Sequence, residues 1–589
     1  MKRLLLVLAA VCALNAWAEE AVYEDIVYSL DLDKMTAEVG LNPRAYGEIV
    51  IPETIKVDQG DFRVTAVGDN AFKGAKDLTA IELPATIEHI YRSAFEGTGI
   101  YADKANWLDG VLMIDSMYLI AADKSIKPKY EMPGFVKLVA IGAFKGNKTV
   151  TKVTWSESVK VIDHEVFRDC KNLVKLVIPE SVEWIGQDVL TGSGLYTNDK
   201  KWKKGALYVD GCLIATNKDI ASNFVFKSKV PVRLIACNAF AGNKALKSVS
   251  IPEGVKCIPS AAFYKCENLV KAEIPNSVTK VEKFAFYGCG KMAECLLSEG
   301  VTEIGMGAFF ECAALKEQRL GNSIREIEKA TFFGCGLMEK INMPGKLEKI
   351  ADGAFRGCAQ LDKVVFPETL TEIGEMAFAG CATMTKVSLP KQVLQIRMGT
   401  FKACLALREV SLPYGAYSIG EEAFEGCVNL QRVDMPESMF RIGAHAFMSC
   451  ESLRSIYLSD DIQEMEEGAF QKCKTLGKVH LPSNLQDLPE AAFAECTALY
   501  EVELSDGLEN IGNGAFYNCI ALREVKLPAN VVSIGQESFA NCKALKKVVL
   551  NESLEQIGVM AFSGCTNLTI PNVPEGTEVA HGAFKGCKK

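Results

Sequence analysis

One phenylalanine recurs every 23 residues through most of this 589-residue chain, and that period is the strongest constraint on its fold. From Phe240 to Phe562 there are fourteen consecutive steps of 23, and a step of 22 then reaches Phe584. Upstream, the same grid includes Phe72, Phe95, Phe144 and Phe167, with Leu190 in place of one Phe. Repeats of this length stack as coils that contact only their neighbours. The sequence therefore predicts a solenoid of about 21 coils instead of several separate domains.

Each repeat begins with the pattern of a short strand. In the copy that starts at Leu522, Val525 and Leu527 alternate with polar residues, which indicates a strand. Pro528 ends this strand because proline cannot donate to a sheet ladder. Strands at the same place in every coil must stack as one long parallel sheet. At about 4.8 Å per strand, the stack is on the order of 100 Å long.

The rest of each repeat has the pattern of a bend and a tight turn. Gly535 is expected to permit the bend, because glycine tolerates backbone conformations that other residues avoid. Phe539 and Cys542 lie three residues apart, which indicates one helical or 3₁₀ turn that closes the coil.

Two departures from the grid have related sequences. The steps from Phe95 to Phe144 and from Leu190 to Phe240 are longer than 23, and each contains a glycine-bearing insert that is typical of a hairpin. We expect these hairpins near residues 98–138 and 193–234, within one solenoid that spans residues 64–589. Residues 19–63 alternate as strands and are expected to cap the first coil.

The repeat pattern L-x-x-V-x-L-P-x-x-L-x-x-I-G-x-x-A-F-x-x-C resembles the 23-residue leucine-rich repeat of BspA-type bacterial surface proteins. The resemblance extends from about residue 64 to residue 589. It implies a leucine-rich-repeat solenoid, and a surface or secreted binding protein of a kind that often acts as an adhesin.

The first 18 residues have the pattern of a secretory signal. Lys2 and Arg3 precede an apolar run that is too short to span a bilayer, and Ala16 and Ala18 suit cleavage before Glu19. Cys12 leaves open the alternative of a lipoprotein signal. The sequence thus predicts a protein that is secreted or displayed at the cell surface.

Net charge and the length of the apolar stretches argue against nucleic-acid binding and against a membrane span. The net charge of −9 argues against nucleic acid. No later apolar stretch approaches the roughly 20 residues of a membrane span.

Sixteen of the 21 cysteines lie three residues after the repeat phenylalanine. A ladder of identical thiols gives each cysteine two equivalent neighbours, which is not a pairing scheme. Other coils place Ala75, Thr98 or Ser193 at this site, so a small buried residue is the favoured interpretation. Some disulfide cross-linking remains the alternative, because the protein is expected to be exported. Metal binding is disfavoured, since no second type of ligand accompanies the ladder.

No catalytic motif accompanies the repeats. The five histidines occupy different repeat positions, and the chain has no HExxH, GxSxG or phosphate-binding glycine loop. We therefore predict a protein without catalytic activity, cofactor or metal.

Binding is then expected on the outward face of the repeat strands. Most of this face is mixed and polar, but one stretch is rich in Tyr and Arg, the residues that binding hot spots favour. The candidate contact residues are Tyr457, His480 and Tyr500, with Arg408, Arg432, Arg454 and Arg523 at neighbouring strand positions. Ordinary surface variation over some twenty coils is the alternative explanation.

The two inserts supply a second candidate set. Their aromatic residues could stack on sugars or anchor a partner loop. These residues are Tyr101, Trp107, Tyr196 and Trp202. The alternative is that the two tryptophans fill the small core of each hairpin.

Three functions are compatible with these observations. The favoured one is an adhesin-like surface protein that binds an extracellular protein, either of the matrix or of a host or partner cell. The others are a glycan-binding component of a nutrient-capture system and a passive structural spacer.

Overall fold

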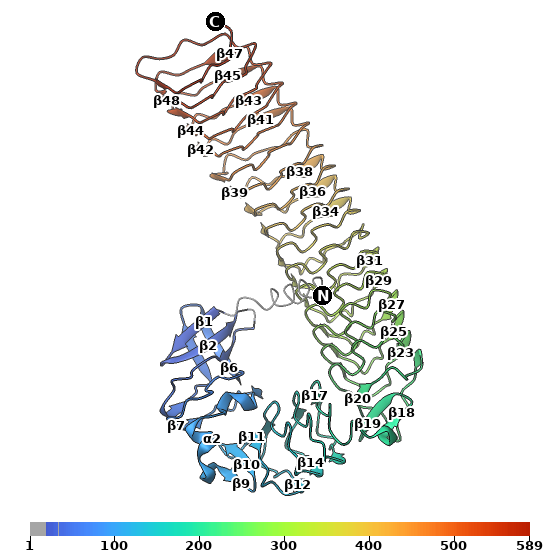
Figure 1. Ribbon diagram of the computed structural model, residues 1–589. Helices are drawn as coiled ribbons and strands as arrows, with labels where there is room; N and C mark the ends of the chain where they lie inside the picture. Colours follow the sequence, from blue (N-terminus) through green and yellow to red (C-terminus); the bar gives the residue numbers. More distant parts are fainter. Residues whose placement is uncertain (1–18, 33) are drawn as a thin grey trace. The chain divides into compact units, whose positions relative to one another are not determined.

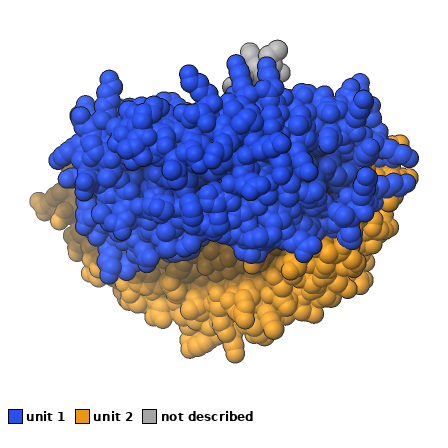
Figure 2. Space-filling view, turned by 90° about the horizontal axis from the view of Figure 1, so that it is seen from below, with its two compact units in different colours: residues 1–221, 226–240 blue, residues 222–225, 241–589 orange. Residues whose placement is uncertain are grey.

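The computed structural model describes residues 19–32 and 34–589, so the predicted signal sequence lies outside the described residues. The chain divides into two compact units. Unit 1 comprises residues 1–221 and 226–240, and unit 2 comprises residues 222–225 and 241–589 (Figures 1 and 2).

Unit 1 begins with a β-rich cap, as the sequence predicts. Its strands are hydrogen-bonded in the order β1-β2-β3-β6-β5, and β6 also pairs in parallel with β8. The cap is thereby joined to the solenoid by backbone hydrogen bonds. The bounds are β1 Glu19–Tyr23, β2 Ile26–Asp31, β3 Thr36–Val39, β5 Thr54–Val57, β6 Gly60–Val67 and β8 His89–Ile90.

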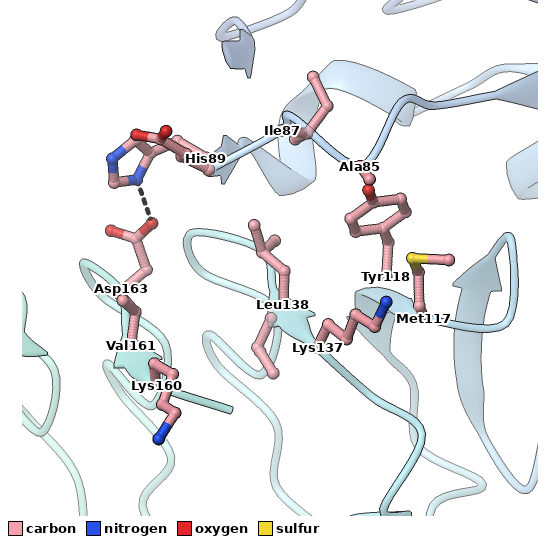
Figure 3. Close-up of a pocket in the computed structure, with 12 residues that line it drawn as sticks. Ala85, Ile87, His89, Met117, Tyr118, Lys137, Leu138, Lys160, Val161 and Asp163 are labelled. Carbon is pink, nitrogen blue, oxygen red and sulfur yellow. Dashed lines mark hydrogen bonds and ion pairs between the residues drawn. The ribbon is translucent and has the colours of Figure 1, made fainter. Parts of the chain in front are cut away.

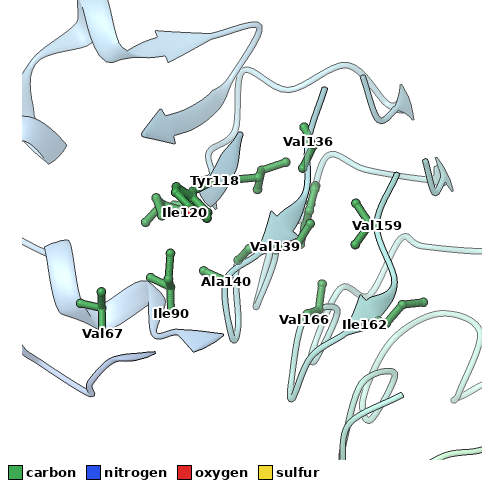
Figure 4. Packing of buried hydrophobic residues seen from close by; sticks show 14 of the residues in the cluster. Val67, Ile90, Tyr118, Ile120, Val136, Val139, Ala140, Val159, Ile162 and Val166 are labelled. Atoms are coloured by element: carbon green, nitrogen blue, oxygen red, sulfur yellow. The ribbon is translucent and has the colours of Figure 1, made fainter. Parts of the chain in front are cut away.

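The other coils of unit 1 carry two rows of short strands. The first row contains β4 Gly47–Val50, β7 Leu78–Glu82, β12 Lys129–Glu131, β14 Lys152–Thr154 and β16 Lys175–Val177. The second row contains β13 Leu138–Val139, β15 Val161–Ile162, β17 Trp184–Ile185 and β22 Leu234–Ile235. Figure 4 shows apolar side chains packed in the interior, among them Ile90 of β8 and Val139 and Ile162 of this second row.

Each insert is an antiparallel hairpin with an additional turn of the solenoid. The first contains α2 Gly99–Ala102, η2 Lys104–Asn106, β9 Trp107–Leu108, β10 Val111–Ile114 and β11 Tyr118–Ala122. The second contains η3 Asp199–Lys201, β18 Trp202–Lys203, β19 Ala206–Val209 and β20 Cys212–Thr216. The last hairpin strands, β11 and β20, pair in parallel with β13 and β22. The chain consequently has about 24 turns, slightly more than the 21 predicted from the phenylalanine grid.

Each hairpin also supplies an acceptor for a backbone N–H that, in a regular coil, bonds to the strand of the next coil. In a regular coil, the N–H after the first strand donates to the next coil, as Ile251 N–H does to the Glu273 carbonyl at 3.0 Å. Before the inserts, Leu83 N–H donates instead to the Asp115 carboxylate at 2.7 Å, and Ile178 N–H donates to Asp210 at 2.9 Å. A carboxylate from the hairpin turn thus replaces the missing strand carbonyl in both places.

Unit 2 repeats the same two rows through stacked coils (Figure 1). Its first row contains β21 Asn223–Phe224, β23 Ser248–Ser250, β25 Lys271–Glu273, β27 Glu294–Leu296, β29 Glu317–Gln318, β31 Lys340–Ile341, β34 Lys386–Ser388, β36 Glu409–Ser411, β38 Arg432–Asp434, β41 Lys478–His480, β43 Glu501–Glu503, β45 Glu524–Lys526 and β47 Lys547–Val549.

Its second row contains β24 Cys257–Ile258, β26 Lys280–Val281, β28 Glu303–Ile304, β30 Glu326–Ile327, β32 Lys349–Ile350, β33 Glu372–Ile373, β35 Gln395–Ile396, β37 Ser418–Ile419, β39 Arg441–Ile442, β40 Glu464–Met465, β42 Asp487–Leu488, β44 Asn510–Ile511, β46 Ser533–Ile534, β48 Gln556–Ile557 and β49 Glu578–Val579. Neighbouring strands in both rows pair in parallel, but each row is broken into short sheets. The sequence predicts only one row, because a two-residue strand leaves no alternation to recognise.

Stacked phenylalanines form the core of unit 2. From Phe263 to Phe584 the rings of successive coils lie 5.0–5.7 Å apart and within 15° of parallel. The i to i+3 bond from Cys542 N–H to the Phe539 carbonyl, at 3.2 Å, closes the predicted turn. The phenylalanine stack therefore follows the 23-residue repeat, and the turn forms at the Phe-x-x-Cys spacing.

The cysteine ladder consists of buried thiols that bond to the backbone. The Sγ of fifteen ladder cysteines lies 2.9–3.5 Å from the phenylalanine carbonyl of the preceding coil, to which each thiol donates. All twenty cysteines of the described residues are free. This arrangement confirms that the ladder serves packing.

The bends do not lie at the glycine that the sequence indicates. Gly535 has an ordinary negative φ, and a Cβ there would come 2.8 Å from the backbone nitrogen of Asn513 in the preceding coil. Its role is thus close approach between coils. The left-handed residues are Glu537 and Asn541, at φ 54° and 62°, on either side of Phe539.

Replacing Ala403 by glycine is expected to stabilise unit 2 by about 0.5–1 kcal/mol. Ala403 has φ 57°, whereas the equivalent residues of the adjacent coils, Gly380 and Gly426, are glycines in the same conformation. The urea midpoint followed by circular dichroism measures the change. The matched variant Ala406→Gly, at a negative φ, should be destabilised, and an equal effect at both sites would contradict the explanation.

Replacing Gln318 by valine is expected to raise the free energy of unfolding by about 1–3 kcal/mol. Gln318 takes the inward strand position where other coils have valine, and its Oε1 has no hydrogen-bond partner within the described part of the chain. Its Nε2 donates only to the neighbouring Arg319 carbonyl at 2.9 Å. The exposed Gln431 provides the control, since Gln431→Val should leave the urea midpoint unchanged. A destabilised Gln318→Val protein would refute this prediction.

Candidate functional site

The first-row strands of unit 2 position the predicted contact residues. Tyr457 and His480 occupy the same outward position on successive coils, and a parallel bridge between Ser455 and Lys478 aligns these coils. Tyr457 is 59% exposed, and His480 is exposed on β41. The structure therefore places these two predicted residues side by side.

His480 belongs to a charged network. Its Nδ1 lies 3.1 Å from Glu503 Oε2, and Lys478 Nζ lies 2.6 Å from Glu503 Oε1 and 2.9 Å from Glu501. The hydrogen bond from Lys478, and then that from His480, lowers the pKa of the Glu503 carboxyl. Hydrogen bonds to Glu503 and Glu501 raise the pKa of Lys478. Beside the exposed Tyr457 ring, the patch thus presents fixed charges of both signs.

Tyr500 lies in a different row from Tyr457 and His480. It precedes β43, is 43% exposed, and its ring lies over Gly477, whose Cβ position is 3.0 Å from the ring edge. The Arg523 guanidinium is 5.8 Å from the ring centre. Tyr500 and Arg523 consequently form a second group, three strand positions away from the His480 row.

The remaining predicted arginines differ in their position and in their ion pairs. Arg454 is exposed in the same row as Tyr500. Arg432 pairs with Asp434 of its own strand, with 2.6 Å between Nε and Oδ1. Arg408 is exposed two coils before Arg454. The predicted patch therefore consists of two neighbouring rows, one with Tyr457 and His480 and the other with Tyr500. Arg408 and Arg432 lie at the margin of the patch.

The aromatic residues of the inserts pack against each other. Tyr101 and Trp107 meet edge to face at 5.2 Å, as do Tyr196 and Trp202. Each indole N–H donates to the tyrosine carbonyl, at 3.0 Å in the first insert and 2.7 Å in the second. Their rings fill the hairpin cores and are only half-buried, so part of each remains accessible.

A third exposed apolar group was not predicted from the sequence. It lies directly before the second-row strands, where most coils have polar residues. Its members are Leu394, Tyr417 and Phe440 on successive coils, with the 86% exposed Tyr414 nearby. A comparison of the residues at this repeat position from coil to coil could have found the group. The position stands out only when the second row of strands is known.

The repeat family is established by a family model. The model of the BspA type leucine rich repeat region matches six times, at residues 52–113, 129–199, 233–362, 325–454, 395–502 and 463–589. The chain belongs to the BspA-type leucine-rich repeat family. This result confirms the resemblance derived from the 23-residue pattern.

Several solved structures are similar to this BspA-type chain. A leucine-rich repeat protein from Bacteroides ovatus is 20% identical, covers 90% of this chain and 100% of its own, and gives a TM-score of 0.40. A leucine rich cell surface protein from Faecalibacterium prausnitzii is 17% identical over 83% of this chain and 96% of its own, with a TM-score of 0.31. The pneumococcal vaccine antigen PcpA is 13% identical over 96% and 98%, with a TM-score of 0.31. No curated protein matches the chain.

Helices in the described residues are all too short or too polar to cross a membrane.

Proposed function

We propose that this BspA-type protein is exported, remains at or near the bacterial cell surface, and binds an extracellular protein without catalysing a reaction. The observation that supports this function most is the exposure of variable outward residues on a repetitive, closely bonded framework. The phenylalanine stack and thiol ladder use the inward positions, so the outward positions are free to differ between coils.

The contact surface that we propose is the pair of rows around Tyr457, His480 and Tyr500. Both tyrosines are exposed, Arg523 places positive charge beside Tyr500, and the ion pair of Lys478 with Glu503 presents both signs on the neighbouring strands. Tyrosine supplies large contact area at low conformational cost, and arginine adds planar hydrogen bonding. Such a surface suits a folded protein partner with both apolar and acidic groups.

Changing Tyr457, His480 and Tyr500 together to alanine is expected to weaken binding at least tenfold, because truncated hot-spot residues typically lose more than about 1 kcal/mol each. The measurement is a pull-down of residues 19–589 against extracellular-matrix proteins and a glycan array, followed by calorimetry of any retained partner. The control changes Leu296, Arg319 and Val365 to alanine, since these take the same outward position on distant coils.

Retention of a protein partner that only the first variant loses supports the proposed surface. Retention by both variants excludes it and directs attention to the hairpins of unit 1. Retention of glycans without any protein favours the nutrient-capture alternative. Mass spectrometry of the protein from the culture medium and from the cell envelope tests export, and a mature chain that begins at Glu19 is expected.

A further inference from the structure

A separate hollow of about 350 Å³ lies in unit 1, beside the second-row strands (Figure 3). Residues from β8, β13 and β15 and from the first hairpin line it. Ile87, Met117, Leu138 and Val161 supply its apolar surface. Pockets of this size and composition, with a few convergent polar groups, are typical of small-molecule sites.

A buried carboxylate forms one end of the hollow. The Asp163 side chain is 2% exposed, and its Oδ2 lies 2.8 Å from His89 Nδ1. Its Oδ1 accepts the His164 backbone N–H at 2.7 Å. Both oxygens of Asp163 are thus engaged, and its charge is directed to His89 and the backbone. In the described residues, no group of three metal-ligating side chains forms a metal site here or elsewhere.

Of the other charged groups of the lining, Glu88 and Lys160 each have an ion-pair partner, and Lys137 has none among the described residues. Glu88 pairs with Arg63 at 3.1 Å, so its charge is compensated. Lys160 lies 3.5 Å from Glu183, and Figure 3 shows its side chain directed away from the hollow. Lys137 runs along the hollow toward Met117 and Tyr118 in the same view. Ion pairs of the lining join Glu88 to Arg63, Asp163 to His89 and Lys160 to Glu183, and within residues 19–32 and 34–589 none involves Lys137.

The apolar surface and the uncompensated ammonium define one ligand chemistry. An apolar body can lie on Ile87 and Leu138, while an anionic group reaches Lys137 Nζ. Lys137 is exposed, so a cationic ligand would meet its ammonium unfavourably and a neutral ligand would gain no charge interaction from it. The volume corresponds to roughly ten non-hydrogen atoms.

We propose that this hollow binds a small organic carboxylate with an apolar body, held by Lys137 at its carboxylate and by Ile87 and Leu138 along its body. This site is distinct from the proposed protein-binding rows, which belong to unit 2. It can therefore hold a ligand whether or not those rows bind a partner.

Calorimetric titration of residues 19–589 with 4-phenylbutyrate tests the proposal. The matched probes are the neutral 4-phenylbutyramide and the cationic 4-phenylbutylamine, which share the apolar body. Binding of the carboxylate is expected with a dissociation constant on the order of 0.1–1 mM, as suits a ligand of this size. The amide should bind at least tenfold more weakly, and the amine more weakly still.

Two substitutions locate the binding. Lys137→Gln should reduce affinity for 4-phenylbutyrate at least tenfold while leaving the amide unaffected, and Leu138→Ser should weaken both. Lys152→Gln, at a half-buried outward position of β14, is the control and should change neither. Tryptophan fluorescence of unit 1 verifies that each variant remains folded. Equal affinity for the three probes, or an unchanged Lys137→Gln protein, would overturn the proposal.

Discussion

At pH 9.5 the free energy of unfolding is expected to be lower than at pH 7 by about 1.4 kcal/mol for each ladder thiol that unfolding exposes. Burial, and then the neighbouring Cys427, raises the pKa of Cys404 well above its ordinary range, and burial acts likewise on Cys381 and Cys450. Ladder thiols with a raised pKa stay protonated in the folded coil at this pH, whereas a hydrogen bond with Cys542 lowers the pKa of Cys565. Because many ladder thiols share the raised pKa, this is the largest effect that we predict.

The direction of the effect follows from proton linkage. A thiol in the unfolded chain has a pKa near 8.5, so above this pH the unfolded state loses protons that the folded state keeps. The stabilisation is fully present below about pH 8.5 and is lost as pH rises toward the folded pKa. Tyrosines contribute little at pH 9.5, because with an unfolded pKa of about 10 they are still mostly protonated in the unfolded chain.

Urea unfolding at pH 7, 8.5 and 9.5, with a reductant present, measures this loss through circular dichroism. A variant with Cys381, Cys404, Cys427 and Cys450 changed to serine is the matched control, since serine keeps a donor for the phenylalanine carbonyl but does not ionise. Between pH 7 and pH 9.5 it should lose about 1.4 kcal/mol less for each replaced thiol. The same pH dependence in both proteins would show that the thiols are not the cause.

Phe401→Ala is expected to destabilise unit 2 by about 3–5 kcal/mol. The ring is fully buried, and its centre lies 5.7 Å from Phe378 and 5.6 Å from Phe424. Its removal leaves a cavity in the stack and deprives both neighbouring rings of a partner. The surrounding coils cannot close this gap, because their backbone bonds fix the spacing between them.

The urea midpoint followed by circular dichroism is again the measurement. Tryptophan fluorescence should stay unchanged, since the four tryptophans of residues 19–589 all lie in unit 1. Tyr414→Ala, which removes an aromatic ring of similar size from an exposed position, should shift the midpoint by less than about 0.5 kcal/mol. A loss below about 1 kcal/mol for Phe401→Ala would mean that the stack is not the main source of stability.

Much of the fold follows from the sequence because its decisive contacts join equivalent residues of adjacent repeats. Phe493 packs on Phe470 and Phe516, and Cys496 donates to the Phe470 carbonyl. Any chain that repeats these residues at a fixed period must make the same contacts in every coil. The solenoid, the parallel pairing and the packing role of the thiols could therefore be predicted without coordinates.

The sequence gives less information on surfaces, because exposed positions lack a periodic signal. Tyr457, His480 and Tyr500 belong to three consecutive coils, which suggests one cluster. Tyr500 nevertheless stands three strand positions away from His480 and lies over Gly477. The row of Leu394, Tyr417 and Phe440 was missed because it precedes a strand too short to show alternation.

By itself, the sequence determined the repeat, the inward residues of each coil and the family to which the chain belongs. Local spacing carries all three, since each coil contacts only its neighbours. The tertiary structure alone decided which contacts form at the two inserts that break the 23-residue period. There, Asp115 and Asp210 replace strand carbonyls, and Asp163 meets His89 from 74 residues away to form one end of the hollow. These contacts depend on how an irregular hairpin packs between coils. The hydrogen bonds to Asp115 and Asp210 each span 32 residues, which is outside the 23-residue period.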